Sequence, residues 1–189
     1  MPRLNRRQVI AGVAAGSVTS IGGCLGHLSN SSSPAQQSMT FPEDPDEFPV
    51  NDDEGIEDRW EDWDETERIK LGSREGIDDA YGPHGIRVIN AADAQPVEFG
   101  VFDVLEDEVI HHERYDLDHD EYLEVSLLRP SKYLVKVRLP DAGTEHGLRV
   151  PCNLFDCNSS STNLEIVDDD HFRSSVISTM VACHETFDC

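Results

Sequence analysis

The sequence predicts an all-β protein whose main domain, residues 84–189, is an antiparallel β-sandwich of about seven strands. About seven short β-type runs follow one another beyond Gly82, and no convincing helical pattern lies between them. The length of 189 residues allows one medium-sized domain with a sizeable core. Only 38% of the residues are hydrophobic and 7% are aromatic, so part of the chain is expected to stay unpacked.

The predicted strands alternate apolar and polar residues, as expected for sheets with one buried face. The clearest example is the stretch 133–139, in which Tyr133, Val135, Val137 and Leu139 occupy every second position. The last two runs flank an acidic turn at 168–171 and are expected to form a hairpin. In chain order, the runs are 86–89, 97–101, 109–115, 122–128, 133–139, 164–167 and 175–181.

Residues 1–23 have the composition of an export signal. They contain three arginines and no acidic residue, and the uncharged stretch 9–23 is rich in glycine and alanine. A membrane-spanning helix needs roughly 20 mostly apolar residues, so this stretch is too short and too glycine-rich to span. The pair Arg6 and Arg7, followed by Val9 and Ile10, resembles a twin-arginine signal, although Asn5 replaces the usual Ser or Thr.

The tetrapeptide Ile21-Gly22-Gly23-Cys24 follows directly and resembles a lipobox. In a lipobox, the cysteine takes a diacylglyceryl-type lipid, and a double-chain lipid anchors a protein stably to a membrane. We therefore expect a lipid anchor at Cys24 that holds the protein to the outer face of the cell membrane. The alternative is a free or disulfide-bonded Cys24 on an uncleaved anchor helix.

The segment 24–80 is predicted to be a flexible acidic linker. Its first part, 26–37, is rich in Ser, Asn and Pro and has no periodicity of helix or strand. Between Glu43 and Glu67 there are fourteen acidic residues and one basic residue, a block that repels itself and cannot fold alone.

Two tryptophans interrupt this acidic block. Their spacing places Ile56, Trp60 and Trp63 on one face of a possible short helix near 56–70. We expect this helix to pack on the domain that follows, because exposed tryptophans are usually covered. An acidic–aromatic motif for a partner protein is the alternative.

The net charge of −23 comes from 38 acidic and 15 basic residues, of which three are lysines. It argues against nucleic acid as a partner, because phosphate binding needs clustered Lys and Arg. This composition is typical of haloarchaeal proteins, whose carboxylates keep the surface hydrated in concentrated salt that screens their repulsion. The charge therefore indicates a salty environment and not a cation-binding function.

The order of segments is similar to a group of haloarchaeal surface lipoproteins of unknown function that carry a twin-arginine signal. These proteins combine a lipobox, an acidic linker and an immunoglobulin-like sandwich with a late cysteine, a hairpin and a C-terminal cysteine. The resemblance rests on Arg6, Arg7 and Cys24 and on the strand pattern of 84–189. It implies a location and an immunoglobulin-like fold, and it implies no activity.

Apart from Cys24, the chain has an even set of cysteines, Cys152, Cys157, Cys183 and Cys189. Outside the cell such a set is expected to form two disulfides, with three possible connectivities. We favour a crossed set that links the 152/157 loop to the 183/189 tail and fastens the final strand. The rival is a structural zinc site, although five residues between the last two cysteines exceed the usual spacing of about two to four.

Two further patterns resemble binding sites. The stretch 116–120 resembles the opening of a calcium loop, but Glu121 stands where the loop needs Gly and Leu127 where it needs Glu, so we expect a solvated acidic loop. His111 and His112 are neighbours, so in a strand they point to opposite faces and cannot chelate together, while His111 can share a face with Glu113.

No hydrolase, metalloprotease or phosphate-binding motif occurs, so we expect neither an enzyme nor a bound cofactor or metal. The sequence predicts a non-catalytic binding or structural module at the cell surface. The alternative is a metal- or ligand-binding accessory lipoprotein of a transporter or redox system, and a surface hydrolase is a third hypothesis. The protein or small-molecule partner is not predicted.

Overall fold

The computed structural model describes residues 39–51, 63–179 and 182–183. Residues Ser38–Cys189 form one compact unit, and the preceding unit, Met1–Gln37, lies outside the described residues. The predicted export signal and the predicted tether at 26–37 therefore lie outside them as well.

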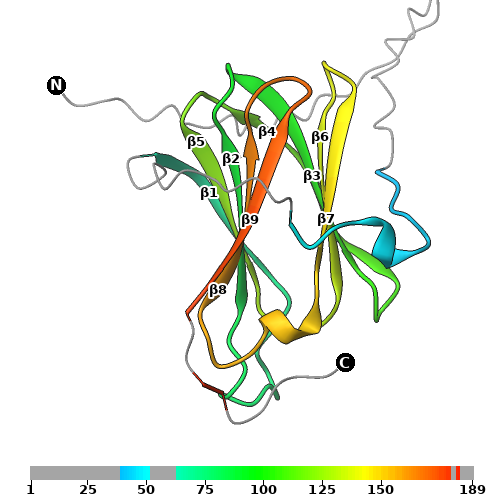
Figure 1. Cartoon of the computed structure of the whole chain (residues 1–189), viewed down its shortest axis with the longest axis vertical. Helices are drawn as coiled ribbons and strands as arrows, with labels where there is room; N and C mark the ends of the chain where they lie inside the picture. Colours follow the sequence, from blue (N-terminus) through cyan, green and yellow to red (C-terminus); the bar gives the residue numbers. More distant parts are fainter. Residues whose placement is uncertain (1–38, 52–62, 180–181, 184–189) are drawn as a thin grey trace, which may run out of the picture. The chain divides into compact units, whose positions relative to one another are not determined.

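Two β-sheets face each other in a sandwich (Figure 1), which confirms the predicted fold class. A five-stranded sheet has the order β1-β5-β2-β8-β9, and a four-stranded sheet has the order β4-β3-β6-β7. The described strands are β1 (Asp64–Leu71), β2 (His84–Asn90), β3 (Gln95–Asp103), β4 (Glu108–Leu117), β5 (Glu121–Leu127), β6 (Tyr133–Leu139), β7 (Thr144–Val150), β8 (Ser160–Ile166) and β9 (Phe172–Ser178). Of the described 3₁₀ helices, η1 (Pro45–Glu47) lies before β1 and η3 (Cys152–Leu154) lies between β7 and β8.

The strand pairing corrects the prediction in two respects. Nine strands are described instead of about seven, and the five-stranded sheet is mixed, because β1 pairs parallel with β5 and β2 pairs parallel with β8. All pairs of the four-stranded sheet are antiparallel. The predicted hairpin around 168–171 is confirmed, since β8 and β9 pair antiparallel across it.

The core lies between the inner faces of the two sheets. The alternation predicted for 133–139 is confirmed, because the side chains of Tyr133, Val135, Val137 and Leu139 all belong to the buried core cluster. Phe99 of β3 lies near the centre of this core and is fully buried. At one edge, the rings of His146 in β7 and Phe172 in β9 stack with centroids 5.2 Å apart, so this contact joins the two sheets.

The predicted helix near 56–70 is wrong over its second half, because Asp64–Leu71 forms strand β1. Most of β1 is exposed, and only Ile69 and Leu71 pack against the core. Pairing with β5 along its whole length outweighs the weak helical pattern, as tertiary contacts commonly do. Ile56 and Trp60 lie outside the described residues, and Trp63 lies in a bend just before the strand.

The predicted linker is also wrong over residues 39–51, which we call the strap. The strap packs on the outer face of the four-stranded sheet and begins with Met39, which is buried (Figure 1, blue to cyan). The ring of Phe41 stacks on that of Phe102 in β3 with centroids 5.4 Å apart. The apolar side chains of the strap find sites on the sheet, so this acidic stretch folds with the domain and not as a separate linker.

Candidate functional site

Three of the four predicted cysteines, Cys152, Cys157 and Cys183, lie in the described residues at one end of the sandwich, which we call the cysteine end. Cys157, after η3, forms a disulfide with Cys183, after β9, with the two Cα atoms 5.7 Å apart. This bond is one of the predicted crossed set, and it contradicts a zinc site that needs all four thiolates. Cys152 is buried and is also disulfide-bonded, whereas Cys189 lies outside the described residues, so its pairing stays a prediction.

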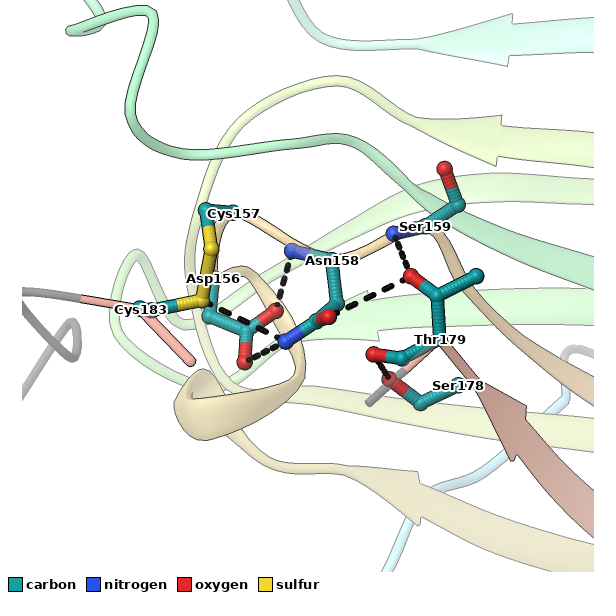
Figure 2. Close-up of a disulfide and its surroundings, with 7 residues drawn as sticks. All are labelled: Asp156, Cys157, Asn158, Ser159, Ser178, Thr179 and Cys183. Atoms are coloured by element: carbon teal, nitrogen blue, oxygen red, sulfur yellow. Dashed lines mark hydrogen bonds between the residues drawn. A yellow bond between two sulfur atoms is a disulfide. The ribbon is translucent and has the colours of Figure 1, made fainter. Parts of the chain in front are cut away.

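Asn158 ties the disulfide to the end of β9 (Figure 2). Its side-chain amide donates to Asp156 Oδ2 at 2.9 Å and to Cys183 Sγ at 3.3 Å, and its Oδ1 accepts from Thr179 Oγ1 at 3.2 Å. The backbone N–H of Ser159 donates to the same threonine oxygen at 3.0 Å. The polar atoms around the disulfide are thus used to hold two chain segments together.

A buried histidine lies beside this end and was not predicted. His84, the first residue of β2, is fully buried, with Nδ1 2.8 Å from Ser160 Oγ and Nε2 2.9 Å from Thr162 Oγ1. Ser160 donates its own hydroxyl proton to the carbonyl of Leu154 at 2.6 Å, so it must accept from Nδ1–H. Nε2 is then the acceptor and Thr162 the donor. Burial lowers the pKa of His84 to about 4.

This geometry does not make a catalytic dyad of His84 and Ser160. A general base must accept the proton of the nucleophile, and here the histidine donates to the serine. The imidazole is also closed to solvent, with the ring of Phe155 5.8 Å away. Both ring nitrogens have hydroxyl partners, so the group is a hydrogen-bonded part of the core. Its partners lie 76 and 78 residues further along the chain, which explains why the sequence did not reveal it.

The two neighbouring histidines of β4 lie on opposite faces, as predicted. His111 shares its face with Glu113 and Tyr115, whose hydroxyl lies 3.0 Å from His111 Nε2 and donates to Glu113 Oε2 at 3.1 Å. Burial lowers the pKa of His111, and burial together with the Glu113 hydrogen bond raises the pKa of Tyr115. His112 lies across the sheet, 4.0 Å from Glu98 Oε2.

The opposite end of the sandwich holds an open cleft of about 700 Å³. Four loops between strands enclose it, and four of its lining residues are aspartates. The backbone N–H of Asp170 donates to Asp168 Oδ1 at 3.1 Å, and this bond lowers the pKa of the Asp168 carboxyl. The lining residues are Ala91, Ala92, Asp93, His119, Ala142, Thr144, Val167, Asp168, Asp169 and Asp170.

The segment that resembled a calcium loop lies beside this cleft. His119 Nδ1 is 2.9 Å from the carbonyl oxygen of Ala92, and Asp118 N–H donates to Glu121 Oε2 at 2.9 Å. These contacts belong to a tight turn in which Asp120 has a positive φ of 62°. Within the described part of the chain, no three His, Cys, Asp or Glu side chains are grouped to hold a metal ion. The cleft can admit a small polar molecule, and its carboxylates favour a positive charge.

The remaining predicted site residues, Arg6, Arg7 and Cys24, lie outside the described residues. In the portion that is described, no helix is long and apolar enough to cross a membrane.

Comparison with known proteins adds a limited likeness of fold. The chain matches no protein-family model and no curated protein. Among solved structures, it is similar to sea bream transthyretin in complex with thyroxine, with a TM-score of 0.33 and 8% identity over 53% of this chain and 98% of that one. A protein from Eubacterium rectale gives a TM-score of 0.34 and 13% identity, over 57% of this chain and 100% of that one. At these values, no ligand or activity is transferred to this protein.

Proposed function

We propose that this protein is a membrane-anchored extracellular lipoprotein of a halophilic archaeon that serves as a non-catalytic binding or structural module at the cell surface. The observation that carries the proposal is the position of the lipobox-like sequence ending at Cys24. It follows a twin-arginine-like signal and stands shortly before the compact unit that begins at Ser38. A lipid there would tether a folded domain by a short Ser- and Asn-rich segment.

Two features of the domain support an external location. The disulfide between Cys157 and Cys183 fits an oxidising exterior, because intracellular thiols are usually kept reduced. The excess of acidic residues fits a protein that stays soluble in concentrated salt. His84 has a structural role, because hydroxyl groups inside the core occupy both of its ring nitrogens.

Mass spectrometry of the mature protein from a haloarchaeal host tests the anchor. We expect a chain that begins at Cys24 and carries a diacylglyceryl-type mass, found in the membrane fraction. Cys24→Ser is expected to lack that mass and leave the membrane, and the control Cys157→Ser removes a different cysteine and keeps it. An unmodified Cys24 behind an intact signal would refute the lipoprotein proposal. Arg6→Lys combined with Arg7→Lys is expected to block export and leave precursor inside the cell.

The cleft favours a second candidate function, a ligand-binding accessory lipoprotein. Its opening between four loops and its aspartates suit a small cationic ligand. Calorimetric titration of the chain with divalent metal ions, after treatment with a chelator, tests this function. Binding that Asp168→Asn and Asp170→Asn together abolish would support it, and no heat in either protein would count against a metal-binding role.

A further inference from the structure

The strap is held on the four-stranded sheet by two sockets that glycines create. Gly100 of β3 lies under Met39 and Phe41, and a Cβ at this position would overlap the Met39 sulfur. Gly147 of β7 lies under the ring of Phe48, which would overlap a Cβ there in the same way. Phe99 and Val101 on either side of Gly100, and Leu148 after Gly147, belong to the buried core cluster, so the sockets open on the outer face. The sheet surface is therefore shaped to receive these three side chains.

Charge and backbone contacts add to the fit. The strap carries four acidic residues and no basic residue, and it meets two cationic side chains of the sheet. Lys136 Nζ, which is almost fully buried, donates to the carbonyl of Thr40 at 2.9 Å. Arg149 forms an ion pair with Asp46, and its backbone N–H donates to the carbonyl of Pro49 at 2.8 Å. Lys136 Nζ also pairs with Glu145 Oε1 of β7 at 2.7 Å, so the charge contact between sheet and strap is that of Arg149 with Asp46.

The turn in the middle of the strap is held by its own residues. Asp44 Oδ1 accepts from the N–H of Asp46 at 2.9 Å, and Pro45 at the start of η1 fixes its own φ. The N–H of Phe48 then donates to the carbonyl of Pro45 at 3.3 Å. A segment with a locally held turn loses less entropy when it docks, whichever chain supplies it. The contacts of Met39, Phe41, Asp46 and Phe48 with the sheet involve only the strap and the sheet, so a strap from either copy can make them.

We propose that the outer face of the four-stranded sheet is a peptide-binding surface that accepts the strap of a second copy as well as its own. Exchange of an identical segment creates an interface from contacts that already exist within one copy. The strap of the same copy has a high effective concentration at its own sheet, so it competes well with the strap of another copy. Exchange is therefore favoured where copies are crowded or where the docking of a copy's own strap is weakened. The ligand class is an acidic peptide with a central turn and with apolar anchors at the positions of Met39, Phe41 and Phe48.

Complementary variants test this surface without relying on the lipid anchor. The starting protein is the chain from residue 25 onward, which includes the whole compact unit and lacks Cys24. One variant, Phe41→Ala with Phe48→Ala, keeps the sockets and loses the anchors. The other, Gly100→Ala with Gly147→Ala, keeps the anchors and fills the sockets. Gly85→Ala is the matched control, a glycine in strand β2 whose added Cβ would meet Ser161 and no strap residue.

By light scattering after size-exclusion chromatography, each variant alone is expected to be a monomer. Their equimolar mixture is expected to contain a species of twice the monomer mass. Only the mixture combines intact anchors with intact sockets. The Gly85 control keeps its own strap docked on its own sockets. Its mixture with the Phe variant is therefore expected to give much less of the species of twice the mass. Folded variants that stay monomeric when mixed would overturn the proposal.

A second measurement covers the case in which the double glycine variant fails to fold. A synthetic peptide of residues 38–51, labelled with a fluorophore, is titrated into the variant Phe41→Ala with Phe48→Ala. We expect saturable binding there and at least tenfold weaker binding to the unmodified chain, whose surface is already occupied. Equal binding to both proteins, or binding to neither, would overturn the proposal.

Discussion

Replacing His84 with glutamine should flatten the response of this protein to mild acid. In the native protein the imidazole is neutral, donates from Nδ1 to Ser160 and accepts from Thr162 at Nε2. A proton added at Nε2 would remove that acceptor and place a charge in the core, away from solvent. The neutral amide of glutamine can hydrogen-bond but takes up no proton in this pH range.

The size of the effect follows from the pKa values. Burial lowers the pKa of His84 from 6.5 to about 4, so between these values the unfolded chain binds more protons than the folded one. Stability therefore falls as the pH falls below the unfolded value, and the loss is complete below the folded value. The full loss is about 3 kcal/mol, of which roughly 2 kcal/mol appears between about pH 7 and about pH 5. Above about pH 7 the group has almost no effect on stability.

Denaturant unfolding in concentrated salt, at several pH values between about 5 and 7, measures this difference. We expect His84→Gln to be less stable than the unmodified protein at neutral pH and to lose about 2 kcal/mol less on acidification. His119→Gln is the control, because that side chain is 60% exposed and lies at the other end of the sandwich. Parallel pH profiles for the unmodified protein and His84→Gln would refute the account, as would an NMR titration of the folded protein that gives His84 an ordinary pKa.

Three further predictions concern stability. Cys157→Ser with Cys183→Ser opens a loop of 26 residues and is expected to lower the unfolding free energy by about 3.5 kcal/mol. An unchanged midpoint in denaturant unfolding would contradict this prediction. Asn163 is fully buried and, in the described part of the chain, its amide has no hydrogen-bond partner, so Asn163→Leu is expected to raise the melting temperature, whereas Asn158→Leu should lower it. Asp46→Asn breaks an exposed ion pair and should change the unfolding free energy by under about 1 kcal/mol in calorimetry; a larger loss would contradict its surface character.

The strands that the sequence predicted are those whose apolar residues recur at every second position. The stretch 133–139 is of this kind, and all of its core-facing residues are buried. β1 and β7 were missed because their apolar content is low. β1 is an acidic edge strand, and β7 contains Gly147, a residue that weakens the strand pattern. Such strands are specified by their neighbours in the sheet, and a local pattern cannot show this.

Among the candidate site residues, the sequence predicted that the late cysteines join, and the bond between Cys157 and Cys183 confirms one half of that prediction. The even number and the clustering of these cysteines were enough to predict a disulfide, because cysteines outside the cell usually pair. His84 was not predicted, since a single histidine before an apolar run has no local signature. Its hydroxyl partners lie on β8, which reaches it only when β2 and β8 pair in parallel.

In the concentrated salt that we propose for this protein, glycines and aromatic rings decide where the strap docks. The Debye length there is only about 3 Å or less, so an exposed pair such as Asp46 and Arg149 contributes little. Apolar contacts are not screened, and salts that are excluded from the protein surface strengthen them. The docking of Phe48 on Gly147 therefore keeps its strength where charge complementarity fades. An acidic segment such as the strap can be solvated along most of its length and still be held firmly at two or three apolar points.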